Sequence, residues 1–244
     1  MANVSVKVCG ITNFDDAQVA LQAGADYLGF ILYPRSPRYV TPEKIRQILW
    51  EIRDWRLSAP VSHDQSPLSH LQSPISPQFV GVFVDDTAGA IADILTFTGL
   101  DYAQLHGDEP LDVLRALAGK AFKAIRPAHA QAAEDAAARL APLGLNDGPQ
   151  LLIDAYDPAQ YGGTGQKVDW TVAAELARSY PRLVLAGGLT PANVAQAVRR
   201  VRPWAVDVSS GVEIAPGRKN HDAVRAFVRA ARGSTVVSEQ SSNQ

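Results

Sequence analysis

The sequence is poor in cysteine and carries no excess of charge of either sign. Cys9 is the only cysteine among 244 residues, so the chain has neither an internal disulfide nor a cysteine-rich zinc site. The 23 basic and 25 acidic residues give a formal net charge of −2, which argues against a nucleic-acid partner. The remaining composition, 46% hydrophobic and 20% charged, is that of an ordinary globular protein.

Long hydrophobic runs are missing as well. The first residues, MANVSVKVCGITNFDD, lack the basic stretch and apolar segment of a secretory signal. No window approaches the ~20 consecutive apolar residues that a membrane span requires. The five histidines are scattered, and no cluster with metal-ligand spacing is visible. We therefore expect a soluble cytoplasmic protein with no metal site and no membrane partner.

What the sequence does contain is a regular alternation of short apolar runs and segments with helical periodicity. The expected strands are VKVCGI, YLGFIL, FVGVFV, YAQLHG, FKAIRP, LLIDAY, LVLAGG and AVDVSSG, and a helix-like segment follows each of them. Eight strand–helix units predict a single (β/α)8 TIM barrel, a fold that typically takes ~250 residues. An open doubly wound sheet is the alternative, although it more often has about five or six strands.

Local signals predict where several elements begin and end. Thr41-Pro42 and Thr190-Pro191 each pair an N-cap residue with a proline at the first helical position. Gly24 and Gly99 stand where helix C-caps are expected.

Two segments fall outside the alternation. Residues 53–77 are rich in Ser, Pro and His and lack periodicity, so we expect an insertion between the second helix and the third strand. It should therefore lie at the N-terminal end of the barrel, away from the chemistry. Residues 233–244 are expected to form a disordered tail, which leaves residues 1–232 for the barrel.

Polar residues interrupt four of the expected strands, always on the same side. In the first strand Val6 and Val8 face one way, while Lys7 and Cys9 face the other. The complete polar set is Lys7, Cys9, Gln104, His106, Asp154, Asp207 and Ser209. Because the apolar side belongs against the helices, the polar side is expected to point into the barrel near the C-terminal strand ends, where barrel enzymes carry their chemistry.

Three late loops are rich in glycine: YGGTGQ (161–166), LAGGLT (185–190) and DVSSGVE (207–213). Glycine lets backbone N–H groups approach an anion closely, and the loops after the seventh and eighth strands of such barrels often bind phosphate. The candidate phosphate-binding residues are Gly187, Gly188, Ser210 and Gly211. These loops predict a phosphorylated small-molecule ligand.

Six motifs, taken together and in order, resemble the phosphoribosylanthranilate isomerase family of tryptophan biosynthesis. They are KVCGIT, FILYPRSPRYV, AQLHGDE, LLIDAYDPAQYGGTGQKVDW, LAGGLTPANV and VDVSSGVEIAPGRKN, and they cover nearly the whole barrel. The resemblance implies an aldose–ketose isomerase that carries out an Amadori rearrangement of a phosphoribosyl substrate. It implies no cofactor, because the reaction is an internal redox shift carried by protons, and barrels of this kind can be monomers or homodimers.

The resemblance also implies roles for individual residues. Cys9 corresponds to the general base and Asp154 to the general acid, while Arg38 corresponds to the arginine that meets the anthranilate carboxylate. We expect Lys7 to favour the Cys9 thiolate. Two further lumen residues, His106 and Asp207, are candidate substrate contacts. For His106, a role as a satisfied lumen histidine stays open.

Three other functions remain as alternatives. The histidine-pathway isomerase runs the same rearrangement, but it resembles a barrel with a carboxylate base and two phosphate sites. Indole-3-glycerol phosphate synthase relies on a lysine and a longer N-terminal segment. A catalytically silent barrel that binds a phosphate ligand would have no reason to keep Cys9 together with Asp154.

Overall fold

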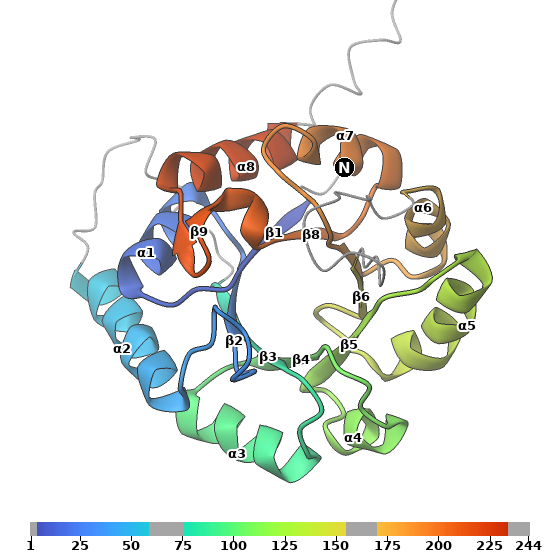
Figure 1. The fold of residues 1–244 in the computed structure, drawn as a ribbon, viewed down its shortest axis with the longest axis horizontal. Helices are drawn as coiled ribbons and strands as arrows, with labels where there is room; N and C mark the ends of the chain where they lie inside the picture. Colours follow the sequence, from blue (N-terminus) through green and yellow to red (C-terminus); the bar gives the residue numbers. More distant parts are fainter. Residues whose placement is uncertain (1–3, 59–75, 155–169, 234–244) are drawn as a thin grey trace, which may run out of the picture.

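Eight parallel strands close into a barrel in sequence order, with the helices outside it (Figure 1). The computed structural model describes residues 4–58, 76–154 and 170–233. Each strand pairs with its sequence neighbours, and β1 (Ser5–Cys9) pairs with β8 (Ala205–Val208) to complete the ring. This closure confirms the (β/α)8 TIM barrel and excludes the open doubly wound sheet.

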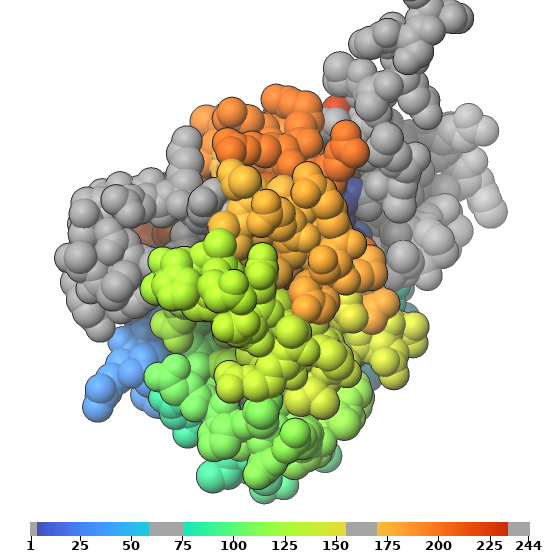
Figure 2. Space-filling model, turned by 90° about the vertical axis from the view of Figure 1, so that its right-hand side faces the viewer, coloured from blue at the N-terminus to red at the C-terminus, as the bar shows by residue number. Residues whose placement is uncertain are grey.

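The barrel elements follow the predicted alternation. The remaining strands are β2 (Tyr27–Ile31), β3 (Gln78–Phe83), β4 (Tyr102–Leu105), β5 (Ala121–Ile125), β6 (Leu151–Ile153) and β7 (Leu183–Leu185). The helices are α1 (Phe14–Ala23), α2 (Pro42–Ser58), α3 (Ala88–Thr98), α4 (Leu111–Ala116), α5 (Ala130–Leu140), α6 (Trp170–Ser179), α7 (Val194–Val201) and α8 (His221–Gly233). Short 3-10 helices lie at η2 (Ala141–Leu143) and η3 (Ser210–Val212). On the outside, α5, α6 and α7 pack side by side into a continuous surface (Figure 2).

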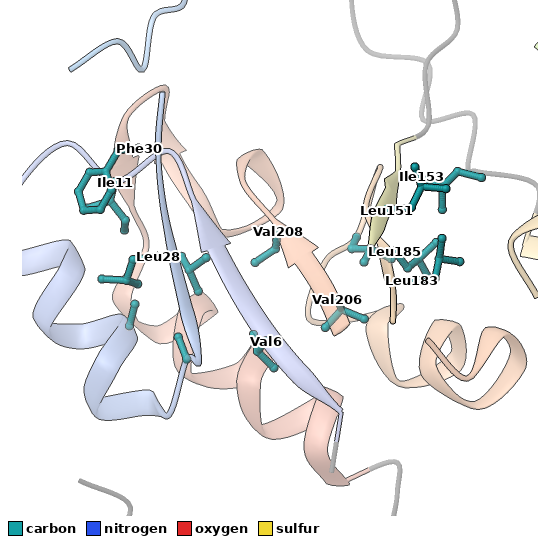
Figure 3. Packing of buried hydrophobic residues seen from close by; sticks show 14 of the residues in the cluster. Val6, Ile11, Leu28, Phe30, Leu151, Ile153, Leu183, Leu185, Val206 and Val208 are labelled. Carbon is teal, nitrogen blue, oxygen red and sulfur yellow. The ribbon is translucent and has the colours of Figure 1, made fainter. Parts of the chain in front are cut away.

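Alternate residues of each strand serve two different cores. The outward set packs between the barrel and the helices, and Figure 3 shows part of it: Val6, Leu28, Phe30, Leu151, Ile153, Leu183, Leu185, Val206 and Val208. Residues of the opposite parity form a separate apolar cluster in the lumen, including Tyr27, Val80, Phe122, Leu152 and Val184. The lumen therefore holds these apolar side chains, and the polar residues Lys7, Gln104 and Asp207 have the same parity. The prediction that the apolar side of each strand faces the helices and the opposite side faces the lumen is confirmed.

Several predicted helix boundaries are confirmed and one is wrong. Gly24 and Gly99 end α1 and α3 in the left-handed conformation, with φ of 97° and 80°. Pro42 begins α2, and the Lys44 N–H donates to the Thr41 hydroxyl at 3.3 Å. In contrast, α7 begins at Val194, not at Thr190-Pro191. The preceding residues form a turn instead, because the Asn193 side chain accepts from the Thr190 N–H at 2.8 Å.

The structure corrects the start of the expected insertion. Helix α2 continues to Ser58, so residues 53–58 are helical. Trp55 anchors this last part, because it is half-buried and its ring packs edge-on against Phe14 at a centroid distance of 6.5 Å. Residues 59–75 and the tail from 234 to 244 lie outside the described residues.

A small antiparallel hairpin in the connection from β8 to α8 was not predicted. It consists of β9 (Glu213–Ala215) and β10 (Arg218–Lys219) and lies beside the ends of β1 and β8 (Figure 1). No helix within residues 4–58, 76–154 and 170–233 is long and apolar enough to cross a membrane.

Candidate active site

The predicted base, Cys9, is the last residue of β1 and is buried, with 6% of its surface exposed. Gly29 of β2 is its register partner. A side chain at Gly29 would place its Cβ 2.6 Å from the Cys9 sulfur and 3.0 Å from the Lys7 ammonium. The absent side chain at position 29 therefore makes room for the thiol and the ammonium group beside each other.

Burial dominates the electrostatics of this thiol. Burial raises the pKa of Cys9, and the Asp207 carboxylate acts in the same direction, while Lys7 and Lys219 lower it. The net effect is a pKa of the Cys9 thiol above its ordinary value. Lys7 does act as predicted, but its effect is smaller than that of burial.

Lys7 and Asp207 form an ion pair in the lumen, with Nζ and Oδ1 3.0 Å apart. The two residues are register partners on neighbouring strands, and only 2% and 11% of their side chains are exposed. Burial lowers the pKa of Lys7, but the neighbouring Asp207 carboxylate and its hydrogen bond, together with the interaction with the Cys9 thiol group, outweigh burial and raise it. Lys7 is therefore an ammonium ion held against a carboxylate, two residues from the thiol on the same side of β1.

The predicted acid, Asp154, directly follows β6 and belongs to a chain of side-chain hydrogen bonds. Gln104 and His106 lie 2.9 Å apart through Nε2 and Nδ1, and His106 Nε2 lies 3.2 Å from Asp154 Oδ2. With the Gln104 amide donating to Nδ1, His106 carries its proton on Nε2 and donates it to Asp154. About a quarter of the side-chain surface of His106 and of Asp154 is exposed, 22% and 25%.

The thiol and the carboxyl group approach the lumen from different sides. In the closed barrel, β8 and β7 separate β1 from β6, so three strand steps lie between Cys9 and Asp154. A ligand in the lumen mouth therefore has a thiol on one side and a carboxyl group on another. This is the arrangement that separate proton donation and proton removal require.

The predicted phosphate loops come together above β7 and β8. Gly187 and Gly188 have φ of 94° and 59°, which favour glycine, and neither donates its backbone N–H to another described residue. A Cβ at Gly211 would lie 1.9 Å from the Leu189 carbonyl oxygen, so glycine is required where the two loops touch. Ser210 begins η3 beside them. The third glycine-rich loop, 161–166, lies outside the described residues.

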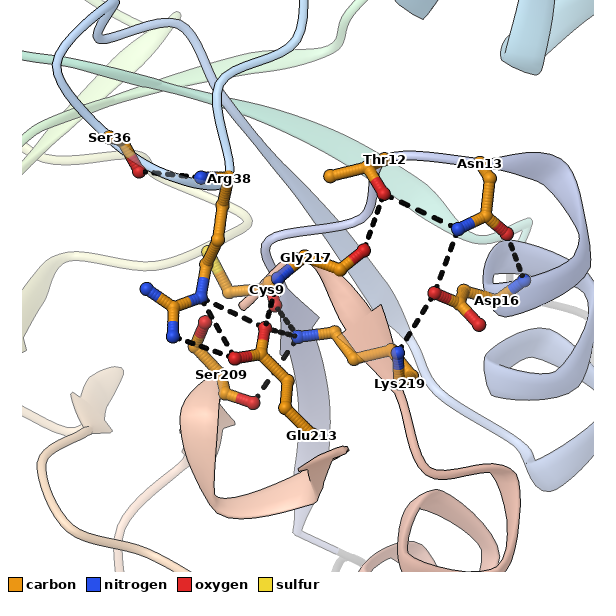
Figure 4. A network of polar contacts seen from close by, with 10 residues as sticks. All are labelled: Cys9, Thr12, Asn13, Asp16, Ser36, Arg38, Ser209, Glu213, Gly217 and Lys219. Carbon is orange, nitrogen blue, oxygen red and sulfur yellow. Dashed lines mark hydrogen bonds and ion pairs between the residues drawn. The ribbon is translucent and has the colours of Figure 1, made fainter. Parts of the chain in front are cut away.

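Arg38, in the connection between β2 and α2, lies beside the end of β1, where it is held by a carboxylate that the sequence did not single out. Glu213 of β9 accepts from Arg38 Nε at 2.9 and 3.0 Å and from Nη2 at 2.6 Å (Figure 4). Lys219 of β10 donates to the same carboxylate at 2.9 Å. The motif VDVSSGVEIAPGRKN contains both residues, but only the hairpin reveals that they meet Arg38.

The electrostatics of this cluster follow from its hydrogen bonds. Burial raises the pKa of Glu213, but the hydrogen bonds from Arg38 and Lys219 outweigh it and lower that pKa. The hydrogen bonds between Arg38 and Glu213 raise the pKa of Arg38. Elsewhere on the rim, Arg126 Nη2 donates to the carbonyl of His106 and supports the end of β4. No group of three or more potential metal ligands occurs in the described part of the chain.

Comparison with known proteins gives consistent matches. A family model described as N-(5'phosphoribosyl)anthranilate (PRA) isomerase matches residues 56–230. The N-(5'-phosphoribosyl)anthranilate isomerase of Trichlorobacter lovleyi is 42% identical over 229 residues, which cover 94% of this chain and 98% of the relative.

Solved structures are similar over the same extent. The phosphoribosyl anthranilate isomerase of Thermotoga maritima is 37% identical with a TM-score of 0.75, covering 94% of this chain and 99% of that one. Monomers generated from that dimeric enzyme have a TM-score of 0.71. An isomerase in complex with reduced 1-(o-carboxyphenylamino)-1-deoxyribulose 5-phosphate is 35% identical with a TM-score of 0.72, again covering 94% and 99% of the two chains.

Proposed function

The chain belongs to the N-(5'-phosphoribosyl)anthranilate isomerase family, and we propose that Cys9 is the general base and Asp154 the general acid of its reaction. The enzyme is an isomerase of tryptophan biosynthesis. It converts N-(5-phosphoribosyl)anthranilate, an aminoaldose, into 1-(2-carboxyphenylamino)-1-deoxyribulose 5-phosphate, an aminoketose. The observation that carries the assignment is the placement of a thiol and a carboxyl group at the mouth of one lumen, three strand steps apart.

The reaction moves protons and needs no external oxidant. Asp154 donates a proton to the furanose ring oxygen as the bond from that oxygen to C1′ breaks, which leaves an open-chain Schiff base. Cys9 then removes the proton from C2′, and the electron pair of that bond neutralises the Schiff base to give an enolamine. Tautomerisation to the ketone reduces C1′ and oxidises C2′ within one molecule, so no cofactor takes part.

The environment of Cys9 fits a base whose anion is stabilised by a neighbouring cation. Because burial raises the pKa of the thiol, its thiolate is a minor species but a strongly basic one. The Lys7 ammonium lies beside it and stabilises the anion when it forms. Burial thus favours the neutral thiol, and the neighbouring ammonium group lowers the free-energy cost of forming the thiolate.

The remaining rim residues are proposed to bind the three parts of the substrate. Arg38 receives the anthranilate carboxylate, since a guanidinium matches a carboxylate with two parallel hydrogen bonds. His106 and Asp207 face the ribose, and the amides of Gly187, Gly188, Ser210 and Gly211 receive the phosphate. We propose that the enzyme acts in the cytoplasm, as a monomer or a homodimer.

The assignment is tested by following anthranilate fluorescence while freshly prepared phosphoribosylanthranilate is consumed. Removing a general acid or base typically costs about 10²–10⁴ in rate, so Cys9→Ala and Asp154→Asn should each lower kcat at least a hundredfold. Both should still bind the reduced product analogue. A Cys9→Ala enzyme with near wild-type turnover would return the thiol to a packing role. Ligand binding by the wild-type protein without consumption would identify a silent binding barrel.

A further inference from the structure

The Glu213 carboxylate lies between two cations and is almost completely buried. Its side chain is 4% exposed, that of Lys219 is not exposed, and that of Arg38 is 20% exposed. Two positive charges on one carboxylate leave the cluster with a net positive charge on the Arg38 side. One carboxylate cannot neutralise both cations, so Arg38 can still bind a second anion.

The hydrogen bonds leave one edge of the Arg38 guanidinium available. Glu213 engages the side edge, formed by Nε and Nη2. A guanidinium has five N–H donors, and its end edge, formed by Nη1 and the second proton of Nη2, is a separate site for a carboxylate. Figure 4 shows one guanidinium nitrogen pointing away from Glu213, and Nη1 donates to no other described residue.

Lys219 fixes this cluster to the strand that carries the thiol. Its ammonium donates to the carbonyl oxygens of Cys9, at 2.6 Å, and of Ser209, at 3.2 Å. The Arg38 side chain crosses directly over the next residue, because a Cβ at Gly10 would lie 2.8 Å from Arg38 Cδ. The carboxylate, the guanidinium and the end of β1 therefore form one rigid unit.

We infer that Glu213 and Lys219 are positioning residues for Arg38. They hold its end edge toward the aromatic carboxylate of the substrate and fix the position of the guanidinium relative to Cys9. The inference rests on the proposed role of Arg38 as the carboxylate contact. A lysine at position 38 would keep the charge but has no second edge, so it cannot meet Glu213 and a substrate carboxylate in this geometry.

Two other roles for Glu213 make different predictions. As an internal competitor it would occupy Arg38 until the substrate displaced it, so neutralising it would tighten substrate binding. As a purely structural ion pair it would affect the binding of every ligand, or only the thermal stability. A positioning role alone weakens binding of the carboxylate selectively.

The test measures dissociation constants for two stable probes: reduced 1-(o-carboxyphenylamino)-1-deoxyribulose 5-phosphate and the corresponding anilino compound without the carboxylate. Glu213→Gln keeps the shape of the side chain and removes its charge. We expect it to weaken binding of the carboxylated probe about tenfold, in line with one charge-assisted hydrogen bond, and to leave binding of the other probe unchanged. KM for phosphoribosylanthranilate should rise with little change in kcat.

Matched variants separate the possible failures. Asp222→Asn removes a carboxylate from the exposed Asp222–Arg225 pair on α8 and should change neither probe. Tighter binding by Glu213→Gln, or an equal loss for both probes, would overturn the inference. If Arg38→Ala does not reduce the preference for the carboxylated probe, the proposed role of Arg38 itself fails.

A second variant covers the case in which Glu213→Gln does not fold. Arg38→Lys should lose the preference for the carboxylated probe as completely as Arg38→Ala does, because it lacks the second edge. If Arg38→Lys retains the preference, the two-edge geometry is wrong, whereas the carboxylate role of position 38 stands.

Discussion

The two sides of the lumen mouth hold their polar groups by different means. The cysteine side, made of Lys7, Cys9, Arg38, Asp207, Glu213 and Lys219, is built from ion pairs, and all of its side chains except that of Arg38 are buried or nearly so. The aspartate side, made of Gln104, His106 and Asp154, is a chain of two hydrogen bonds to a partly exposed imidazole.

This difference matches the two proposed tasks. A base that must abstract a carbon-bound proton gains from a dry, rigid setting, because the reacting atoms must be aligned closely. An acid that must regain its proton after each turnover gains from contact with solvent, and the side chains of His106 and Asp154 are each about a quarter exposed, 22% and 25%. The contrast predicts that the same kind of substitution has a larger effect on the cysteine side than on the aspartate side.

The largest effect on stability is expected for Lys7→Met. The change leaves Asp207, whose side chain is 11% exposed, without its partner. Breaking a buried ion pair on one side costs about 3–5 kcal/mol, and we expect the lower end of that range in urea unfolding. The double variant Lys7→Met/Asp207→Asn should recover most of the loss, since it removes the unpaired charge. A loss below about 1 kcal/mol for the single variant would show that the pair is not what stabilises this side.

A smaller effect on stability is expected from the protonation of Glu213 at low pH. The pKa of Glu213 is lowered in the folded protein from its usual value of 4.5. Its contribution to stability is therefore fully present above that value and is lost as the pH falls through the lowered pKa. We expect the difference in unfolding free energy between wild type and Glu213→Gln to be constant above about pH 6, and no more than about 3 kcal/mol, as for hydrogen bonds to a charged group.

The measurement is urea unfolding from neutral to acidic pH, with Asp222→Asn as the control. The Asp222 carboxylate is almost fully exposed, so that variant should follow the wild type throughout. A difference between wild type and Glu213→Gln that grows as the pH falls would have the wrong sign for a carboxylate stabilised by two cations.

The sequence predicted the aspartate side and the strand residues of the cysteine side because strand parity is a local property. Lys7, Gln104 and His106 each stand two residues apart from another lumen residue, and an alternating pattern shows this directly. Glu213 and Lys219 were missed as partners of Arg38 because they lie 175 or more residues from it in the chain, and no local pattern records such a pair. The start of α7 was missed for a related reason, since the Asn193 side chain builds a turn where Thr190-Pro191 signals a helix.

The smallest effect is expected at Gln104, the aspartate-side counterpart of Lys7. Both residues are buried in the lumen at 1% exposure, but the Gln104 side chain is neutral and makes one hydrogen bond to a described residue, His106. Its Oε1 has no hydrogen-bond partner among the described residues.

Gln104→Leu removes both the bond and this unsatisfied oxygen, so the two contributions oppose each other. The net change in unfolding free energy should therefore stay within about 1 kcal/mol. Urea unfolding of Gln104→Leu and Lys7→Met compares the loss of stability at two lumen positions of equal burial. Turnover of Gln104→Leu should fall less than that of Asp154→Asn, because His106 remains beside Asp154. An equal loss of unfolding free energy in the two variants would mean that burial, and not charge, determines how much each residue contributes to stability.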